Sequence, residues 1–138
     1  MNSPVDFTPA QLQCLNALVD TLIPPDDWPG GVDAGVVDYL AQLLATDLPD
    51  MLPIYKTALD LLDAEATTGL FASLDSDERI ALLSTLERGE TSQAWPFAPS
   101  WFLSMASTHA AEGYYSDSGN GGNRDGVAWK MIGFEVRG

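Results

Sequence analysis

Basic residues are scarce in this sequence of 138 residues. Lysine and arginine together number 6, against 20 aspartates and glutamates, which gives a formal net charge of −14. A chain this acidic repels both the phosphate backbone of nucleic acids and the anionic surface of membranes. The composition therefore argues against nucleic-acid binding and membrane-surface binding as functions of the protein.

Cysteine and histidine each occur once, as Cys14 and His109. A single cysteine can form no internal disulfide and cannot supply the thiolate set of a zinc or iron–sulfur site. We expect Cys14 to be a small, semi-buried residue of a helix and His109 to be a satisfied or interfacial side chain. A general-base role for His109, with Glu112 three residues on, is the weaker alternative.

Long hydrophobic runs are also missing. No stretch reaches the roughly 18 to 20 apolar residues of a membrane span, and residues 1–7 lack the features of a signal peptide. We therefore expect no direct membrane insertion. The compartment stays open between the cytoplasm and the periplasm, the latter reached by co-export with a partner. Apolar residues make up 46% of the chain, enough for the core of one domain of this length.

What the sequence does contain is a series of amphipathic segments with helical spacing. Thr8 and Gln11 form a capping box at the start of the first segment, which is predicted over about residues 9–23 and ends at Pro24. Asp33 is expected to cap the second segment. A break at residues 49–53 precedes the third segment.

The later segments show the same signals. Gly69 is expected to stop the third helix, and Asp75 with Glu78 forms a capping box for the fourth. The fourth helix is expected to bury Ile80, Leu83 and Leu86 and to end at Gly89. The fifth helix is expected to carry Trp101, Phe102, Met105, His109 and Glu112 and to terminate at Gly113. We therefore predict an all-α fold, a single compact domain of about five helices over residues 1–138, with a flexible N-terminus at residues 1–7.

The segment 114–138 differs from the helical body and is predicted to be an irregular, glycine-rich tail. Residues 119–138 carry a net charge of +1, whereas residues 1–118 carry −15. The spacing of its glycines matches neither a dinucleotide fingerprint nor a phosphate loop, and the ligand order of a calcium loop is missing. Two interpretations stay open: a surface that docks on another protein, or a tail that wraps back onto the helices.

The motifs of this tail are similar to the ending of a known family. They are Gly113–Asp117, Gly121–Gly126 and Trp129–Phe134, and the segments Thr8–Gln11 and Gly35–Asp38 agree with the amino-terminal half of the same family. On these residues the sequence resembles the small subunit of gluconate 2-dehydrogenase, known as subunit 3, and of related flavin-dependent sugar dehydrogenases.

The resemblance implies that the chain is a non-catalytic accessory subunit with no cofactor of its own. Its expected partner is a large flavoprotein of the glucose-methanol-choline type that holds FAD and oxidises a sugar or glycoside, with a cytochrome c subunit as a further partner. The chain would bind and stabilise the large subunit and assist its folding. The expected partner-contact residues are Tyr114, Tyr115, Gly121, Gly122, Asn123, Arg124, Asp125, Trp129, Lys130 and Phe134. The alternatives are a free-standing acidic adaptor and, more weakly, a hydrolase that uses an aspartate or His109.

Overall fold

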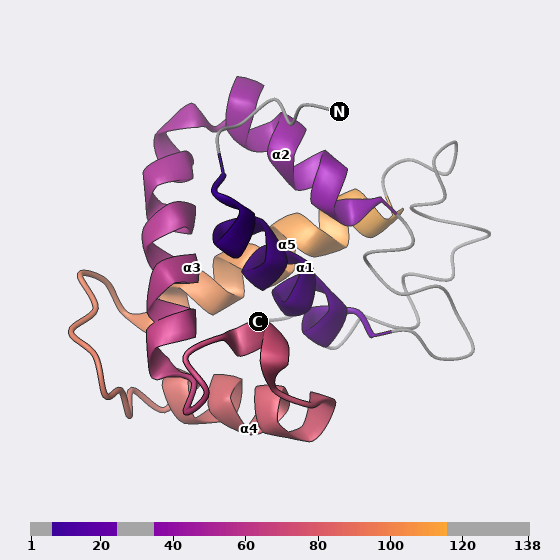
Figure 1. The fold of residues 1–138 in the computed structure, drawn as a ribbon. Coiled ribbons are helices and arrows are strands. Elements are labelled where there is room, and N and C mark those ends of the chain that lie inside the picture. Colours follow the sequence, from indigo (N-terminus) through magenta and orange to yellow (C-terminus); the bar gives the residue numbers. More distant parts are fainter. Residues whose placement is uncertain (1–6, 25–34, 116–138) are drawn as a thin grey trace.

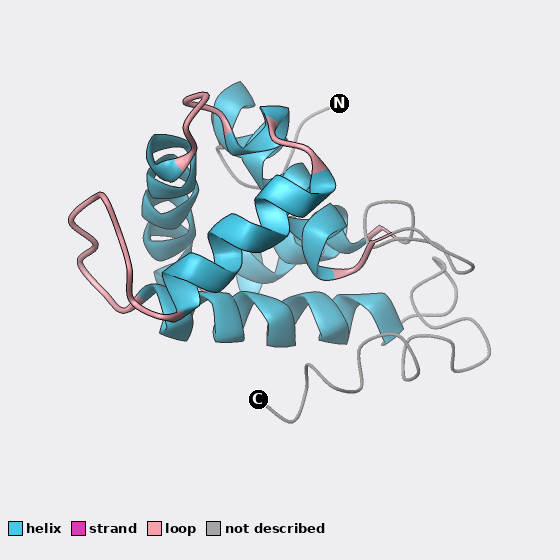
Figure 2. Cartoon of the chain, turned by 90° about the horizontal axis from the view of Figure 1, so that it is seen from below, coloured by secondary structure: helices cyan, strands magenta, loops and turns pink. Residues whose placement is uncertain are grey.

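The structure, a computed structural model, describes residues 7–24 and 35–115. Within these ranges the chain forms five α-helices, two short 3₁₀ helices and no strand, which confirms the predicted all-α fold (Figures 1 and 2). The elements are α1 (Pro9–Leu22), α2 (Val36–Thr46), η1 (Pro49–Met51), α3 (Leu52–Glu65), η2 (Phe71–Ser73), α4 (Ser76–Glu87) and α5 (Pro99–Tyr115).

Helix α1 is the centre of the arrangement. It packs against α2, α3, α4, α5 and η2, and Figure 1 shows it surrounded by the other four helices. Its apolar stripe is fully enclosed, since Leu15, Leu18 and Val19 are each no more than 1% exposed. The largest side chains buried around it come from the other elements and include Tyr55, Phe71, Phe102 and Tyr114. Burial of this stripe supplies the hydrophobic free energy that holds the helices together.

The predicted capping boxes are confirmed. Thr8 Oγ1 accepts from Gln11 N and Gln11 Oε1 accepts from Thr8 N, both at 3.0 Å. At α4 the Asp75 carboxylate accepts from Glu78 N at 2.8 Å, and the Glu78 carboxylate accepts from Asp75 N at 2.9 Å. These motifs are recognisable in the sequence because both partners lie within one turn of helix.

The predicted boundaries at the start of α2 and the end of α3 were wrong. The N-cap of α2 is Gly35, with φ of 84°, and not Asp33, which lies outside the described residues. A left-handed residue directly before Val36 turns the chain, so the helix cannot begin earlier. Helix α3 ends at Glu65, and Gly69 instead supplies the positive φ of the turn that follows.

The buried stripe of α4 also differs from the prediction. Leu83 and Leu86 are buried as expected, but Ile80 is 54% exposed. Arg79 takes the inner position: its guanidinium donates to the Ala72 carbonyl at 2.7 Å and lies 5.9 Å from the centre of the Phe71 ring. The stem of Arg79 is apolar and one nitrogen of its head is bonded to the Ala72 carbonyl, although Nε is buried without a hydrogen-bond partner. A long side chain of this kind can occupy a core-facing position, which a simple hydrophobic pattern does not anticipate.

Helix α5 does not end at Gly113, as predicted, but continues through Tyr114 to Tyr115. Gly113 is buried where α5 crosses α2, and a Cβ built there would lie 2.5 Å from Cδ2 and 2.8 Å from Cγ of Tyr39. The glycine is therefore needed for close approach of the two helices, and it is not a stop signal. Residues 114 and 115, predicted to open the irregular segment, are helical, and residues 116–138 lie outside the described ranges.

We predict that Gly113→Ala destabilises the fold by about 1 to 3 kcal/mol, because the methyl group would overlap the Tyr39 ring. Alanine is the better helix former by about 1 kcal/mol, so a net loss would isolate the effect of the contact. Denaturant unfolding followed by circular dichroism measures the change. Thr108→Ala, at an exposed site of the same helix, should change the free energy of unfolding by no more than about 0.5 kcal/mol. A stabilised Gly113→Ala protein would contradict the prediction.

Candidate functional site

Two of the predicted partner-contact residues lie in the described part of the chain, at the end of α5. Tyr114 is 2% exposed, so its side chain belongs to the helical core of this chain and not to an exposed surface. Tyr115 is the last residue of the helix. The other predicted contact residues, Gly121 to Asp125, Trp129, Lys130 and Phe134, lie outside the described residues. The described structure therefore includes the first two of the predicted contact residues and none of the others.

His109 has a structural partner one helix away. Its Nδ1 lies 2.8 Å from the hydroxyl of Tyr55, a residue of α3 that is fully buried, and the two rings stack with centres 6.0 Å apart. Burial lowers the pKa of His109, although the charge of Glu112 acts in the opposite direction. The histidine is thus a satisfied side chain, as expected, with its Nδ1 engaged by a phenol.

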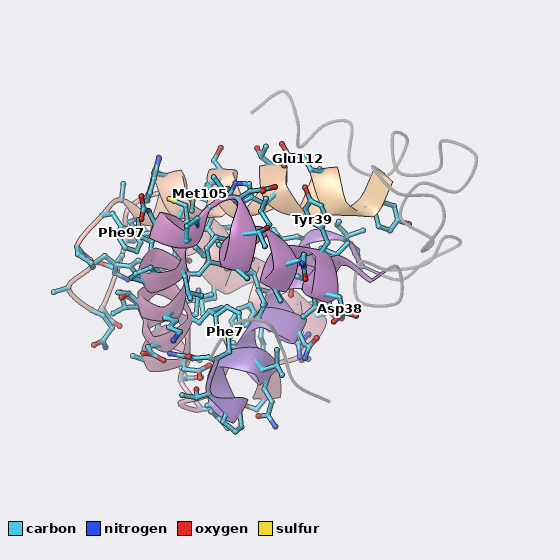
Figure 3. All side chains as sticks on the ribbon, turned by 90° about the horizontal axis from the view of Figure 1, so that it is seen from above. Phe7, Asp38, Tyr39, Phe97, Met105 and Glu112 are labelled. Carbon is cyan, nitrogen blue, oxygen red and sulfur yellow. The ribbon has the colours of Figure 1, made fainter. Side chains whose placement is uncertain are left out.

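The same region holds two further polar side chains. Figure 3 shows Tyr39 on α2 beside Glu112 on α5. Burial and the charge of Glu112 raise the pKa of Tyr39, and the same two causes raise the pKa of Tyr55. Both phenols therefore stay protonated at neutral pH. Together Tyr39, Tyr55, His109 and Glu112 form a polar cluster between α2, α3 and α5, in which Glu112 is the acidic side chain.

Cys14 is more deeply buried than the expected semi-buried position, at 1% exposure. Its thiol donates to the carbonyl oxygen of Leu59 at a sulfur–oxygen distance of 3.5 Å. Burial raises the pKa of the thiol strongly, and the neighbouring charge of Asp63 adds to the shift. The thiolate and not the thiol is the nucleophile, so a thiol that stays protonated is unreactive. The role of Cys14 is therefore to pack in the core.

The described residues contain no cluster suited to a metal ion. Across residues 7–24 and 35–115, no three or more histidine, cysteine, aspartate or glutamate side chains gather closely enough to hold one. In the same ranges no helix has the length and apolar character needed to cross a membrane.

The connector between α4 and α5 is held by a single carboxylate that the sequence analysis did not single out. Glu65, at the end of α3, accepts from Ser92 N at 2.9 Å, Ser92 Oγ at 2.8 Å, Gln93 N at 3.0 Å and Trp95 Nε1 at 2.9 Å. Burial acts to raise the pKa of Glu65, but the hydrogen bonds from Ser92, Trp95 and Gln93 outweigh it and lower the pKa. A charged acceptor with several donors is a strong local restraint.

Beyond this restraint, aromatic rings link the connector to the core. Phe97 packs edge-on against Trp95 and Trp101, with ring centres 5.9 and 5.6 Å apart, and lies 6.2 Å from Phe102. Phe102 in turn contacts Tyr55 at 5.1 Å. Trp101 is 45% exposed at the outer end of this series. The helical spacing of the sequence predicts Trp101 on the fifth helix but gives no reason to expect its exposure.

Comparison with known proteins gives one match. A family model described as gluconate 2-dehydrogenase subunit 3 matches residues 9–136, which spans the five helices and most of the glycine-rich tail. No curated protein and no solved structure matches the sequence.

We predict that the stability of the fold decreases as the pH falls from about 7 to 5.5. The folded-state pKa of His109 lies below its ordinary value of 6.5, so the unfolded chain binds the proton more readily and protonation favours unfolding. His109→Gln, which keeps a polar group near Tyr55 without this titration, should flatten the pH dependence in that window. Urea unfolding at a series of pH values measures it, and equal slopes for both proteins would contradict the assignment.

The buried thiol makes a separate prediction. At pH 8 a thiol reagent such as dithionitrobenzoate should label Cys14 in the folded protein at least about a hundredfold more slowly than in the unfolded protein, because reaction requires both opening and deprotonation. Labelling in guanidinium chloride should give one thiol per chain and serves as the control. Rapid labelling of the folded chain would show that Cys14 is accessible.

Proposed function

Since the chain belongs to the gluconate 2-dehydrogenase subunit 3 family, we propose that it acts as a non-catalytic small subunit that binds and stabilises a large, FAD-bearing sugar dehydrogenase. Membership implies a partner dehydrogenase subunit. We further propose that this partner is of the glucose-methanol-choline type, that FAD resides in the partner, and that its substrate is a sugar or glycoside. The small subunit would assist the folding of the large one.

The extent of the family match carries the proposal. The match begins at the first residue of α1 and continues to residue 136, so the helical body and the charged, glycine-rich tail belong to one family pattern. A binding role agrees with the state of the two side chains best suited to chemistry: Cys14 is a buried thiol and His109 is bonded to Tyr55. Binding to the folded partner alone would stabilise that partner by mass action.

The charge distribution supports the tail as one contact region. The tail carries Arg124, Lys130 and Arg137 in a chain with 6 basic residues in total, and it contains Trp129. Arginine and tryptophan are the side chains that most often dominate the free energy of binding at protein interfaces. We therefore keep Gly121 to Asp125, Trp129, Lys130 and Phe134 as the proposed contact residues of the tail.

Purification of the tagged chain from its native host tests the proposal. We expect a large yellow subunit to copurify in fixed stoichiometry, to show the visible absorption of a flavin, and to reduce a dye when a sugar is added. Mass analysis would identify the large subunit. A colourless monomer would contradict the accessory-subunit role and favour the free-standing adaptor, and turnover of a substrate by the isolated chain would favour the hydrolase.

Arg124→Ala and Trp129→Ala test the contact residues of the tail. Each substitution should weaken assembly with the large subunit by about 2 kcal/mol, because each removes an anchor of the kind that dominates interfaces. Titration of the purified large subunit measures the dissociation constant. Thr46→Ala, at an exposed site at the end of α2, should leave it unchanged. If both tail variants assemble like the unmodified chain, the tail is not the contact region.

A further inference from the structure

The first turn of α5 exposes the largest apolar side chain on the described surface. Among the described residues three large hydrophobic side chains are strongly exposed, those of Leu70, Ile80 and Trp101. Tryptophan has the greatest apolar area of the three. Trp101 is 45% exposed, beside Phe97 and one turn before Met105, both of which are partly buried. We call Phe97, Trp101, Ser104 and Met105 the Trp101 surface; Figure 3 labels Phe97 and Met105 at this end of α5.

Contacts within this chain hold the side chains of the Trp101 surface in position. Phe97 supports the Trp101 ring edge-on at 5.6 Å and is itself joined to the core through Phe102. Glu65 fixes the preceding connector by its bonds to Ser92, Gln93 and Trp95. An anchor that is already ordered loses little conformational entropy on binding, so more of its contact free energy appears as affinity.

The surface also lacks charged side chains, although the chain as a whole carries a net charge of −14. Residues 91–111 contain no aspartate, glutamate, lysine or arginine, and this is the longest such run in the sequence. The exposed positions of α5 within the run are instead filled by Ser100, Ser104 and Thr108, besides Trp101. A solvated helix face normally carries charged side chains. Depletion of charge together with tryptophan and methionine is typical of the centre of a protein interface.

The charges elsewhere decide which partner fits. Residues 7–24 and 35–115 contain thirteen acidic and three basic side chains, and Glu90 and Glu112 border the uncharged run. Two copies of this chain, each with a net charge of −14, would repel one another if their Trp101 surfaces met. A complementary partner surface has an apolar pocket for the tryptophan and a border of lysine or arginine side chains.

We propose that the Trp101 surface is a second docking site for the large dehydrogenase subunit, separate from the tail, and that Trp101 enters an apolar pocket with a basic border. This inference rests on the proposed function, because it takes its partner from there. The tail leaves the opposite end of α5, about 20 Å from Trp101 at the rise of an α-helix. Two sites at this separation on one rigid helix would bind more tightly than either alone.

Dissociation constants for the purified full-length chain and the large subunit test the second site. Trp101→Ala should raise the dissociation constant about 30-fold or more, as expected for an anchor residue. Ser104→Arg, one turn along the same face, should weaken binding at least about tenfold without touching the core, because it adds bulk and a charge that the basic border repels. Ile80→Ala, at an exposed apolar site on α4, is the matched control and should change binding less than twofold. Circular dichroism checks that each variant is folded.

A photo-crosslinking residue identifies what covers the surface. Trp101→p-benzoylphenylalanine in the assembled complex should crosslink to the large subunit, and the same replacement of Ile80 should not. Crosslinks to a second copy or to residues 116–138 of the same chain would overturn the inference, as would unchanged affinity of both Trp101→Ala and Ser104→Arg. If the unmodified chain binds no large subunit, the proposed function fails with it; if it binds while these variants bind equally well, the second site alone fails.

Discussion

Burial of α1 is the constraint on which the rest of the structure depends. Leu15, Leu18 and Val19 are closed off from solvent on one short helix, and every other α-helix of the described structure packs against it. A central helix needs partners on all sides, and α2 to α5 provide them by arranging themselves around it. The outer helices consequently need only a narrow buried stripe each, which explains why α4 can expose Ile80 and still hold its place through Leu83 and Leu86.

Polar side chains around this core are matched to partners brought from distant parts of the sequence. The thiol of Cys14 meets the Leu59 carbonyl, and the hydroxyl of Tyr55 meets His109. Such pairs cost little when both groups are satisfied and fix how the helices are rotated against one another. The residues that chemistry would most readily use are thereby committed to the fold, which agrees with a protein whose proposed role is to bind another.

The sequence predicted what is local and missed what depends on tertiary contact. Both capping boxes were predictable because donor and acceptor lie three residues apart. The inward position of Arg79 was not predictable, since it depends on the Ala72 carbonyl and the Phe71 ring. Gly113 was mistaken for a stop signal because only the packing of Tyr39 reveals its role. In the candidate site, the uncharged run 91–111 was visible in the sequence. The exposure of Trp101 was not, because it depends on contacts between residues that are far apart in the chain.

The central place of α1 has a consequence for synthesis on the ribosome. Helix α1 is made before the helices that enclose it, and α5, which closes the core with Phe102 and Tyr114, emerges last among the five. During translation the leucine stripe of α1 therefore stays open to water and to other nascent chains until residue 115 has left the exit tunnel. Chaperones that bind exposed apolar helices would meet this protein early, and its cooperative folding must wait until nearly the whole described chain is available.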